Sequence, residues 1–265
     1  MRNNIKIGSI ILFSVLFVVV LSLALIIENK DSEEIEFIQL NGNYHLSQNE
    51  YLKFAHLENS DSYEGLTVKI IKDRFEKHPY ISKVNLLLTE TTLNIEIIEK
   101  NFEALLMVDG NEYLISDNSI IIPKLPNSEK IDYPIISDPE NKESIKEFNN
   151  SNQNSDLIVG LKIISALKII NTKLYESLSE VNLRQGRDII LQFSNLNIPI
   201  VLGRKKEIEK IILFDKLLEK LDFNRIQNTL AYIDLRYSKY LYVGKENLSN
   251  TEQENNSWKI TLLLV

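Results

Sequence analysis

The chain has 265 residues, a formal net charge of −7 and no cysteine. The acidic balance argues against a protein that binds nucleic acid, because such proteins present a basic surface. The lack of cysteine excludes disulfide bonds and thiolate metal sites. The length leaves room for one or two domains.

An apolar run near the N-terminus, 7–27, contains no charged residue. A helix over this run would be about 31 Å long, close to the hydrocarbon thickness of a bilayer. Arg2 and Lys6 precede the run, and acidic residues follow it. The positive-inside rule therefore predicts a cytoplasmic tail over 1–6, a transmembrane helix over 7–27, a spacer over 28–34 and an exported remainder. A cleaved signal peptide is the alternative, although its apolar region is usually shorter, about 7–15 residues.

The region 35–100 predicts a compact domain with the order β-α-α-β-β. Ser47 and Glu50 form the sequence pattern of a capping box, and Pro79 ends a second helical pattern. Alternating apolar and polar residues at the end of the region indicate a half-buried strand. We expect strands at 35–40, 81–88 and 91–98 and helices at 47–57 and 67–77.

The region 101–246 predicts a β domain with flanking helices. Asp109 and Gly110 separate two apolar runs, which is typical of a β-hairpin. We expect strands at 104–108, 113–115, 181–183, 187–193, 198–202, 232–237 and 240–244, and helices at 156–170 and 207–221. The tail, 247–265, is polar up to 257, and its apolar end adds either a strand or a contact. The whole chain is therefore expected to be of the α+β class.

Several short motifs in this order resemble the bacterial cell-division family of FtsQ and DivIB. They are HPYISKV at 78–84, LNIEIIEK at 93–100, YLISD at 113–117, VLG at 201–203 and IDLRY at 233–237. The chain departs from the family pattern at Phe102, where proline is usual, and at Asn118 and Ser119, which replace a glycine-containing turn.

The resemblance implies a transmembrane anchor, a POTRA domain over 35–100, a β domain over 101–246 and a location at the division septum. It further implies that the terminal strands bind a strand or hairpin of FtsB/DivIC-like and FtsL-like partners. Carried over, Tyr237, Leu241 and Val243 line the docking surface. The expected partner-binding residues are Arg236, Tyr237, Tyr240, Leu241, Tyr242, Val243 and Lys245. Arg236 would meet an acidic partner residue, and Lys245 replaces an aromatic side chain of some relatives.

The residues themselves also favour binding at this segment. The run 240–245 is rich in strand formers and precedes a polar tail, so we expect an open strand edge to which a partner strand can be added. The alternative is that Asp234 and Arg236 pair with each other and the neighbouring tyrosines belong to the core.

No set of residues predicts catalysis or a cofactor. His45, His56 and His78 lack the spacing of a metal site, and no nucleophile or phosphate-binding motif is present. The sequence therefore predicts a non-enzymatic scaffold, with a possible second partner surface at 35–40 and 67–77. The alternatives are a POTRA-bearing component of an envelope transport or assembly machine, and a membrane-bound cell-wall hydrolase or sensor.

Overall fold

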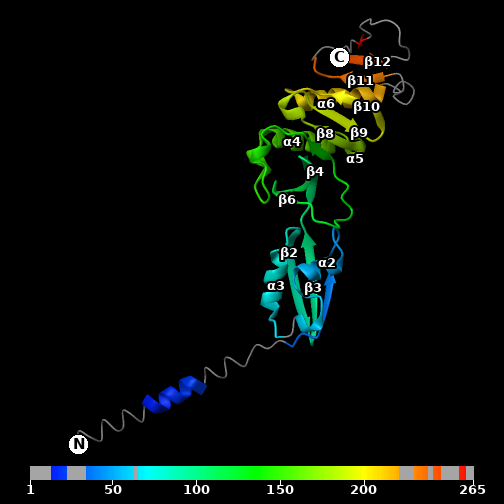
Figure 1. The fold of residues 1–265 in the computed structure, drawn as a ribbon. Coiled ribbons are helices and arrows are strands. Elements are labelled where there is room, and N and C mark those ends of the chain that lie inside the picture. The colour runs from blue at the N-terminus through cyan, green and yellow to red at the C-terminus, as the bar shows by residue number, and fades with distance from the viewer. Residues whose placement is uncertain are drawn as a thin grey trace, which may run out of the picture. The chain divides into compact units, whose positions relative to one another are not determined.

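The structure is a computed structural model that describes residues 13–22, 34–62, 65–220, 230–237, 241–245 and 257–260. The chain divides into two compact units, Met1–Glu99 and Lys100–Val265 (Figure 1). Each unit has its own sheet and its own core, so each is described by itself. The fold is of the mixed α+β class, as the sequence predicts.

The expected transmembrane run 7–27 is described at 13–22, and these residues are helical. Within the part of the chain that the structure describes, no helix has both the length and the apolar character needed to cross a membrane. The remainder of the run and most of the spacer 28–34 lie outside the described residues, so the anchor stays a prediction.

The first unit has the expected order β-α-α-β-β. Its elements are β1 (Phe37–Asn41), α2 (Gln48–Phe54), the short 3-10 turn η1 (Ser60–Ser62), α3 (Val68–Glu76), β2 (Ile81–Thr89) and β3 (Thr92–Glu99). The strands form a three-stranded sheet in which β3 is central, parallel to β1 and antiparallel to β2. Helices α2 and α3 cover one face of it (Figure 1).

The predicted capping box begins α2. The Ser47 side chain accepts from the backbone N–H of Glu50, and the Glu50 carboxylate accepts from the Ser47 N–H. The helix ends earlier than the expected Leu57, because His56 adopts a positive φ of 55°. The alternation of β3 is confirmed, since Leu93, Ile95 and Ile97 are buried against the helices.

The second unit contains ten strands and three α-helices among its described residues. The strands are β4 (Phe102–Val108), β5 (Asn111–Ser116), β6 (Ile121–Pro123), β7 (Ile135–Ser137), β8 (Leu178–Asn182), β9 (Ile190–Phe193), β10 (Leu196–Val201), β11 (Leu230–Asp234), β12 (Leu241–Lys245) and β13 (Ser257–Ile260). The helices are α4 (Ser155–Ile170), α5 (Thr172–Ser177) and α6 (Glu207–Lys220). The predicted hairpin at Asp109 and Gly110 joins β4 to β5, with both residues at positive φ.

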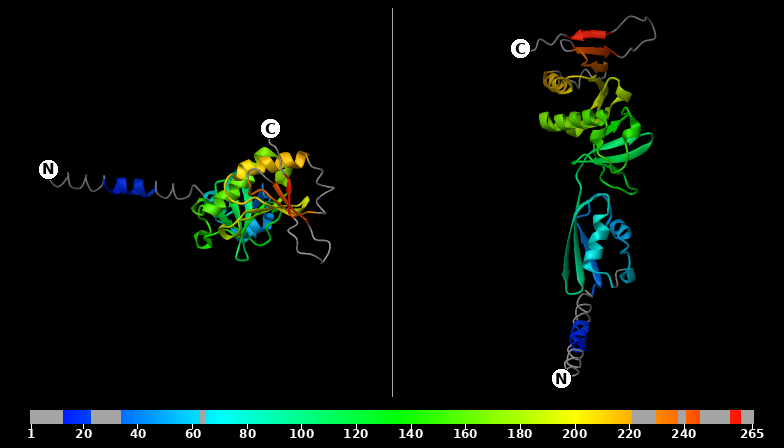
Figure 2. Two further views of the ribbon diagram at one scale, coloured as in Figure 1. Left: turned by 90° about the horizontal axis from the view of Figure 1, so that it is seen from above. Right: turned by 90° about the vertical axis from the view of Figure 1, so that its left-hand side faces the viewer.

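These strands form one sheet in the order β13-β12-β11-β10-β9-β8-β7-β4-β5-β6. Strand β7 is parallel to both of its neighbours, and β10 is joined to the parallel β11 through α6. Helices α4 and α6 pack against each other on one face of the sheet, as the right-hand view of Figure 2 shows. The core lies between these helices and the sheet.

The two ends of this sheet differ. At the β6 end the chain folds back over the strand, since the N–H of Phe148 donates to the Ile121 carbonyl and the N–H of Ile121 donates to the Asn149 carbonyl. A β-bridge between Ile120 and Asn150 extends this cover. At the other end lies β13, and the described residues place no further strand beyond it.

Candidate functional site

The predicted partner-binding segment lies next to the β13 end of the sheet. Strand β12 pairs with β11 on one side, Val243 opposite Ile233, and with β13 on the other, Val243 opposite Trp258. The expectation that 240–245 is an open edge is therefore wrong, because the chain returns after its polar tail and adds its own strand. Among the described residues, the strand with one unpaired edge at this end of the sheet is β13.

The side chains of Leu241 and Val243 do not line a surface. They are 2% and 6% exposed and belong to the core of the second unit, which also contains Ile233 and Leu235. The expectation that their side chains line an exposed surface is wrong, because side chains alternate along a strand and these two face the helix layer.

Arg236 has acidic partners within its own chain. Its Nη2 lies 2.7 Å from Oδ2 of the buried Asp234, and its Nη1 lies 2.7 Å from Oδ2 of Asp188. The hydrogen bonds to Asp234 raise the pKa of Arg236 above its ordinary value. The first half of the sequence alternative, an ion pair between Asp234 and Arg236, is confirmed.

Gly203 and Arg236 bring the VLG and IDLRY motifs into direct contact. The glycine has a φ of +67°, and a Cβ built on it would lie 2.7 Å from Cγ of Arg236. The arginine stem thus packs directly on the glycine backbone, while the N–H of Leu235 donates to the Val201 carbonyl beside it. Both motifs build one corner, where β10 and β11 leave the sheet.

Lys210 on α6 reinforces the same corner. Its buried ammonium donates to the Leu202 carbonyl at 2.8 Å. Burial lowers the pKa of Lys210, although the carboxylates of Glu207, Asp188 and Asp234 oppose that change. The corner is therefore held by charge-assisted hydrogen bonds and not only by apolar packing.

Aromatic side chains gather on the face of β11 and β12 that is turned away from the helices. The ring centroids of Tyr237 and Tyr242 are 5.0 Å apart in an edge-to-face arrangement, and the Tyr232 ring lies over Gly244. Tyr237 is 50% exposed, and the Arg236 guanidinium lies 5.8 Å from its ring centroid. We call Tyr232, Tyr237 and Tyr242 the tyrosine face. The second half of the alternative, tyrosines in the core, is wrong for Tyr237.

The remaining predicted partner-binding residues are Tyr240 and Lys245. Tyr240 lies outside the described residues, and of Lys245 only the backbone is described, paired with Leu230 in the ladder between β11 and β12.

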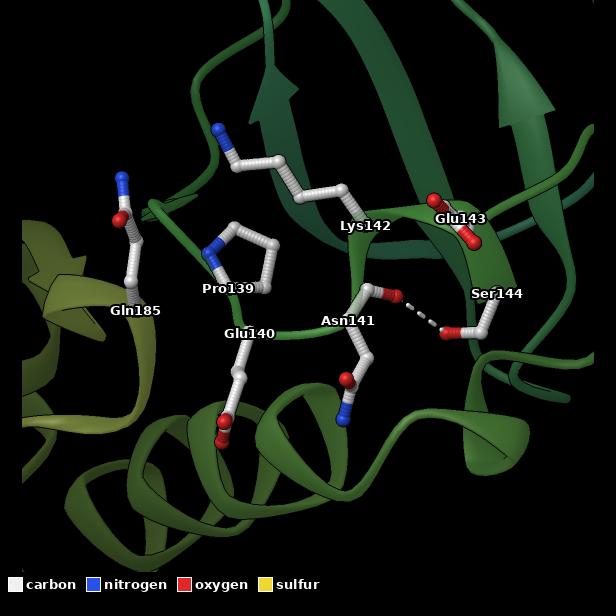
Figure 3. A pocket seen from close by; sticks show the side chains of 7 residues that line it. All are labelled: Pro139, Glu140, Asn141, Lys142, Glu143, Ser144 and Gln185. Atoms are coloured by element: carbon white, nitrogen blue, oxygen red, sulfur yellow. Dashed lines mark hydrogen bonds between the residues drawn. The ribbon is translucent and has the colours of Figure 1, made fainter.

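A surface depression elsewhere in the second unit has mainly structural contacts. It lies between the loop 139–144 and Gln185, and the Ser144 hydroxyl donates to the Asn141 carbonyl (Figure 3). The Lys142 ammonium is 2.6 Å from a carboxylate oxygen of Asp109. The loop is further held because Asn154, the cap of α4, donates to the Glu140 carbonyl. These bonds fix the loop and do not converge on a ligand.

Two of the three histidines of the first unit make contacts within its core and turns. Nδ1 of His45 contacts the Glu99 carboxylate, and Nδ1 of His78 accepts from the Tyr80 N–H at 3.1 Å. Across the described residues, no group of three or more metal-ligating side chains comes together.

A family model described as the C-terminal region of cell division protein FtsQ/DivIB matches residues 104–236, which is half of the chain. This chain belongs to the FtsQ/DivIB family of cell division proteins. The matched stretch ends at Arg236, the residue that closes the corner on Gly203.

Curated relatives extend the similarity beyond that stretch. A protein named cell division protein FtsQ from Geotalea daltonii is 24% identical over 213 residues, which are 80% of this chain and 76% of the relative. A second cell division protein FtsQ, from Geobacter sp. strain M21, is 24% identical over 212 residues with the same coverage. The family resemblance of the sequence motifs is thus confirmed.

Sequence reasoning missed three features of this region. Asp188 is separated from Arg236 by 48 positions, so nothing local marks it as a partner. The sequence predicts either a strand or a contact at the apolar end of the chain, but nothing in it indicates that this strand, β13, pairs with β12. The tyrosine face could have been found by placing Tyr232 and Tyr242 on one side of paired strands.

Proposed function

We propose that the chain is a non-enzymatic scaffold of the cell-division machinery. The apolar run 7–27 anchors it in the cytoplasmic membrane as a single-pass protein with its N-terminus inside and 28–265 outside, concentrated at the division septum. The first unit is a POTRA-like domain, and its β-α-α-β-β order supports this assignment.

The partners in this proposal are FtsB/DivIC-like and FtsL-like division proteins. A strand of the partner is added to the β12–β13 end of the ten-stranded sheet, and its side chains contact the tyrosine face. The observation that carries the proposal is the contrast between the two ends of that sheet: β6 is covered by 148–150, whereas the described residues place no strand beyond β13.

The pair of Tyr237, which is exposed, and Tyr242, which is half-buried, gives this end a surface suited to protein contact. Aromatic side chains dominate the energies of many protein interfaces because they bury large areas at small cost in side-chain entropy. Tyr237 and Tyr242 already pack edge to face, so they present a formed surface to an incoming strand. Arg236 acts as a positioning residue here, since its guanidinium is held by Asp234 and Asp188.

Partner capture tests this proposal. Tyr237→Ala and Tyr242→Ala are each expected to weaken binding of the ectodomain of a division coiled-coil protein about tenfold, which corresponds to ~1.4 kcal/mol. Binding is measured with the purified full chain in detergent, by surface-immobilised titration.

Phe148→Ala is the matched control, because Phe148 is an exposed aromatic residue at the opposite end of the same sheet. It should bind as the parent chain does. Equal binding by the parent and both tyrosine variants, with unchanged thermal unfolding, would remove the tyrosine face from the interface.

A further inference from the structure

Strand β13 occupies the position at which a partner strand would be added to β12. Its four residues pair antiparallel with β12, from Gly244 opposite Ser257 to Leu241 opposite Ile260. It is the terminal strand of the sheet, and the described part of the chain pairs it with no strand other than β12. Its ladder is therefore short and lies at the margin of the sheet.

The connection to β13 is long and polar. Eleven residues, 246–256, separate β12 from β13, and Leu248 is the only large apolar residue among them. By contrast, six residues separate β11 from β12. The core strands β11 and β12 precede this connection in the chain. Strand β13 is therefore a separate segment that is added to a sheet formed by the strands before it.

Pairing in a β-ladder is made by backbone groups that every extended peptide carries. Specificity comes from the alternate side chains. Trp258 and Ile260 stand in register with Val243 and Leu241, the two β12 residues whose side chains are buried in the core. A competing strand therefore needs apolar residues at alternate positions in the same phase.

We propose that β13 is an exchangeable strand that holds the β12 edge until a partner strand with alternating apolar residues displaces it. This proposal rests on the proposed function for the identity of the competing strand. A strand tethered to the same chain acts at an effective concentration on the order of millimolar. The apparent affinity of an incoming strand is therefore its intrinsic affinity multiplied by the fraction of molecules in which β13 has left β12. The C-terminal segment thus sets the threshold at which the scaffold accepts a partner and protects the β12 edge from nonspecific pairing.

A peptide with the sequence of the chain's own C-terminal segment serves as the probe for binding to the β12 edge. A fluorescein-labelled peptide of residues 255–265 is titrated, with anisotropy as the signal, into the full chain and into a variant that ends at Lys245, both purified in detergent. The peptide should bind the shortened variant and bind the full chain about tenfold more weakly or worse, because the tethered strand competes with it. A peptide of the same composition in scrambled order is the control.

A cysteine pair tests the exchange within the intact chain. The chain has no native cysteine, and Tyr242 lies opposite Lys259 in the ladder. The double variant Tyr242→Cys/Lys259→Cys should lose residual peptide binding when oxidised and regain it on reduction. The single variant Tyr242→Cys should show no dependence on reductant.

Three results would contradict the proposal that β13 is an exchangeable strand. These are a shortened variant that is folded but does not bind the peptide, a shortened variant that no longer folds, and equal peptide affinity of the full and shortened chains. The peptide assay needs no division protein, so it can succeed where partner capture fails. In that case the exchange of β13 is supported and the proposed function is not. If partner capture succeeds and the peptide assay fails, the proposed function is supported and the exchange of β13 is not.

Discussion

At the scale of single residues, Gly203 and Arg236 join two short sequence motifs, VLG and IDLRY, at one corner of the second unit. The left-handed φ of Gly203 disfavours any side chain, and the Arg236 stem fills the space that a Cβ would need. The arginine then reaches Asp234, the last residue of β11, and Asp188, which precedes β9. The motifs thus specify the corner that positions β11, and through it β12 and the tyrosine face.

Gly203→Ala should lower the free energy of unfolding of the second unit by more than a side chain at positive φ usually costs. That usual cost is on the order of 1–2 kcal/mol, and displacement of the Arg236 stem should add about 1 kcal/mol. Urea denaturation, monitored by far-UV circular dichroism, measures the total loss in the free energy of unfolding.

Gly110→Ala is the control for this prediction. Gly110 also has a positive φ, 82°, but a Cβ there would meet nothing within 4 Å. The two variants share the backbone strain, so the difference between them isolates the contact with Arg236. Equal losses of stability would show that this contact contributes nothing.

Glu99 has a comparable structural role in the first unit. Its carboxylate accepts from the Tyr51 hydroxyl at 2.6 Å, from the backbone N–H groups of Tyr44 and His45, and contacts the His45 ring. Burial acts to raise the pKa of Glu99, but these hydrogen bonds together bring it below its ordinary value of 4.5. Burial and the adjacent Glu99 raise the pKa of Tyr51.

A lowered pKa in the folded state makes stability depend on pH. The contribution of Glu99 is fully present above pH 4.5, the ordinary value for the unfolded chain, and is lost as the pH falls through the lower folded value. Glu99→Gln should cost about 1–3 kcal/mol at pH 7, because buried donors lose their acceptor, and the difference from the parent should shrink as the pH is lowered toward 3.

Urea denaturation between pH 7 and pH 3 measures this dependence. The control is Glu96→Gln on the same strand, since Glu96 is exposed and bonded only to a side chain of β2 among the described contacts. It should leave both the stability and its slope with pH nearly unchanged. A parent and a Glu99→Gln variant that differ by a constant amount at every pH would contradict the assignment.

At the scale of the elements, the second unit is extended by strands that are too short to be recognised on their own. Strand β7 has three residues, yet it lies parallel between β4 and β8 and connects the two halves of the sheet. Strand β13 has four residues and closes β12. Short strands gain their stability from neighbours on both sides or from the core beneath them, so their own sequences carry a weak signal.

The helices, unlike these short strands, can be recognised from their own sequences. Helix α4 begins at the cap Asn154, which accepts from the N–H groups of Asp156 and Leu157, and its buried side faces β4. Asp156 is held in turn by a bidentate ion pair with Arg204 across the fold. The apolar stripe and the cap are local in sequence, and the expected helices at 156–170 and 207–221 are found within one residue of their predicted ends.

At the scale of the whole molecule, the chain combines an apolar N-terminal run with two compact units of different build. Unit Met1–Glu99 is a three-stranded sheet under two helices, and unit Lys100–Val265 carries the family match and the tyrosine face. In the proposed scaffold, the run 7–27 confines both units to the membrane surface, so the binding end of the second unit meets partners that are confined there as well.

Localisation tests this arrangement in cells. An N-terminal fluorescent fusion of the full chain is expected to form a band at midcell, because anchor and partner contacts act together. A fusion of residues 1–34 keeps the anchor but lacks both units, and should label the envelope uniformly. A uniform signal from the full chain would instead favour a general component of the envelope.

The sequence by itself determined the features that depend on neighbours along the chain. These are the capping box at Ser47, the hairpin at Asp109, the alternation of β3, the α+β class and, through short motifs, the family. Tertiary structure alone decided that β13 pairs with β12, which side chains of β12 face the core, and that Asp188 joins Asp234 in holding Arg236. The physical reason is that strand pairing and ion pairs join residues far apart in sequence, as β12 and β13 do across a long polar connection, and the energy of such contacts leaves no local trace in either segment.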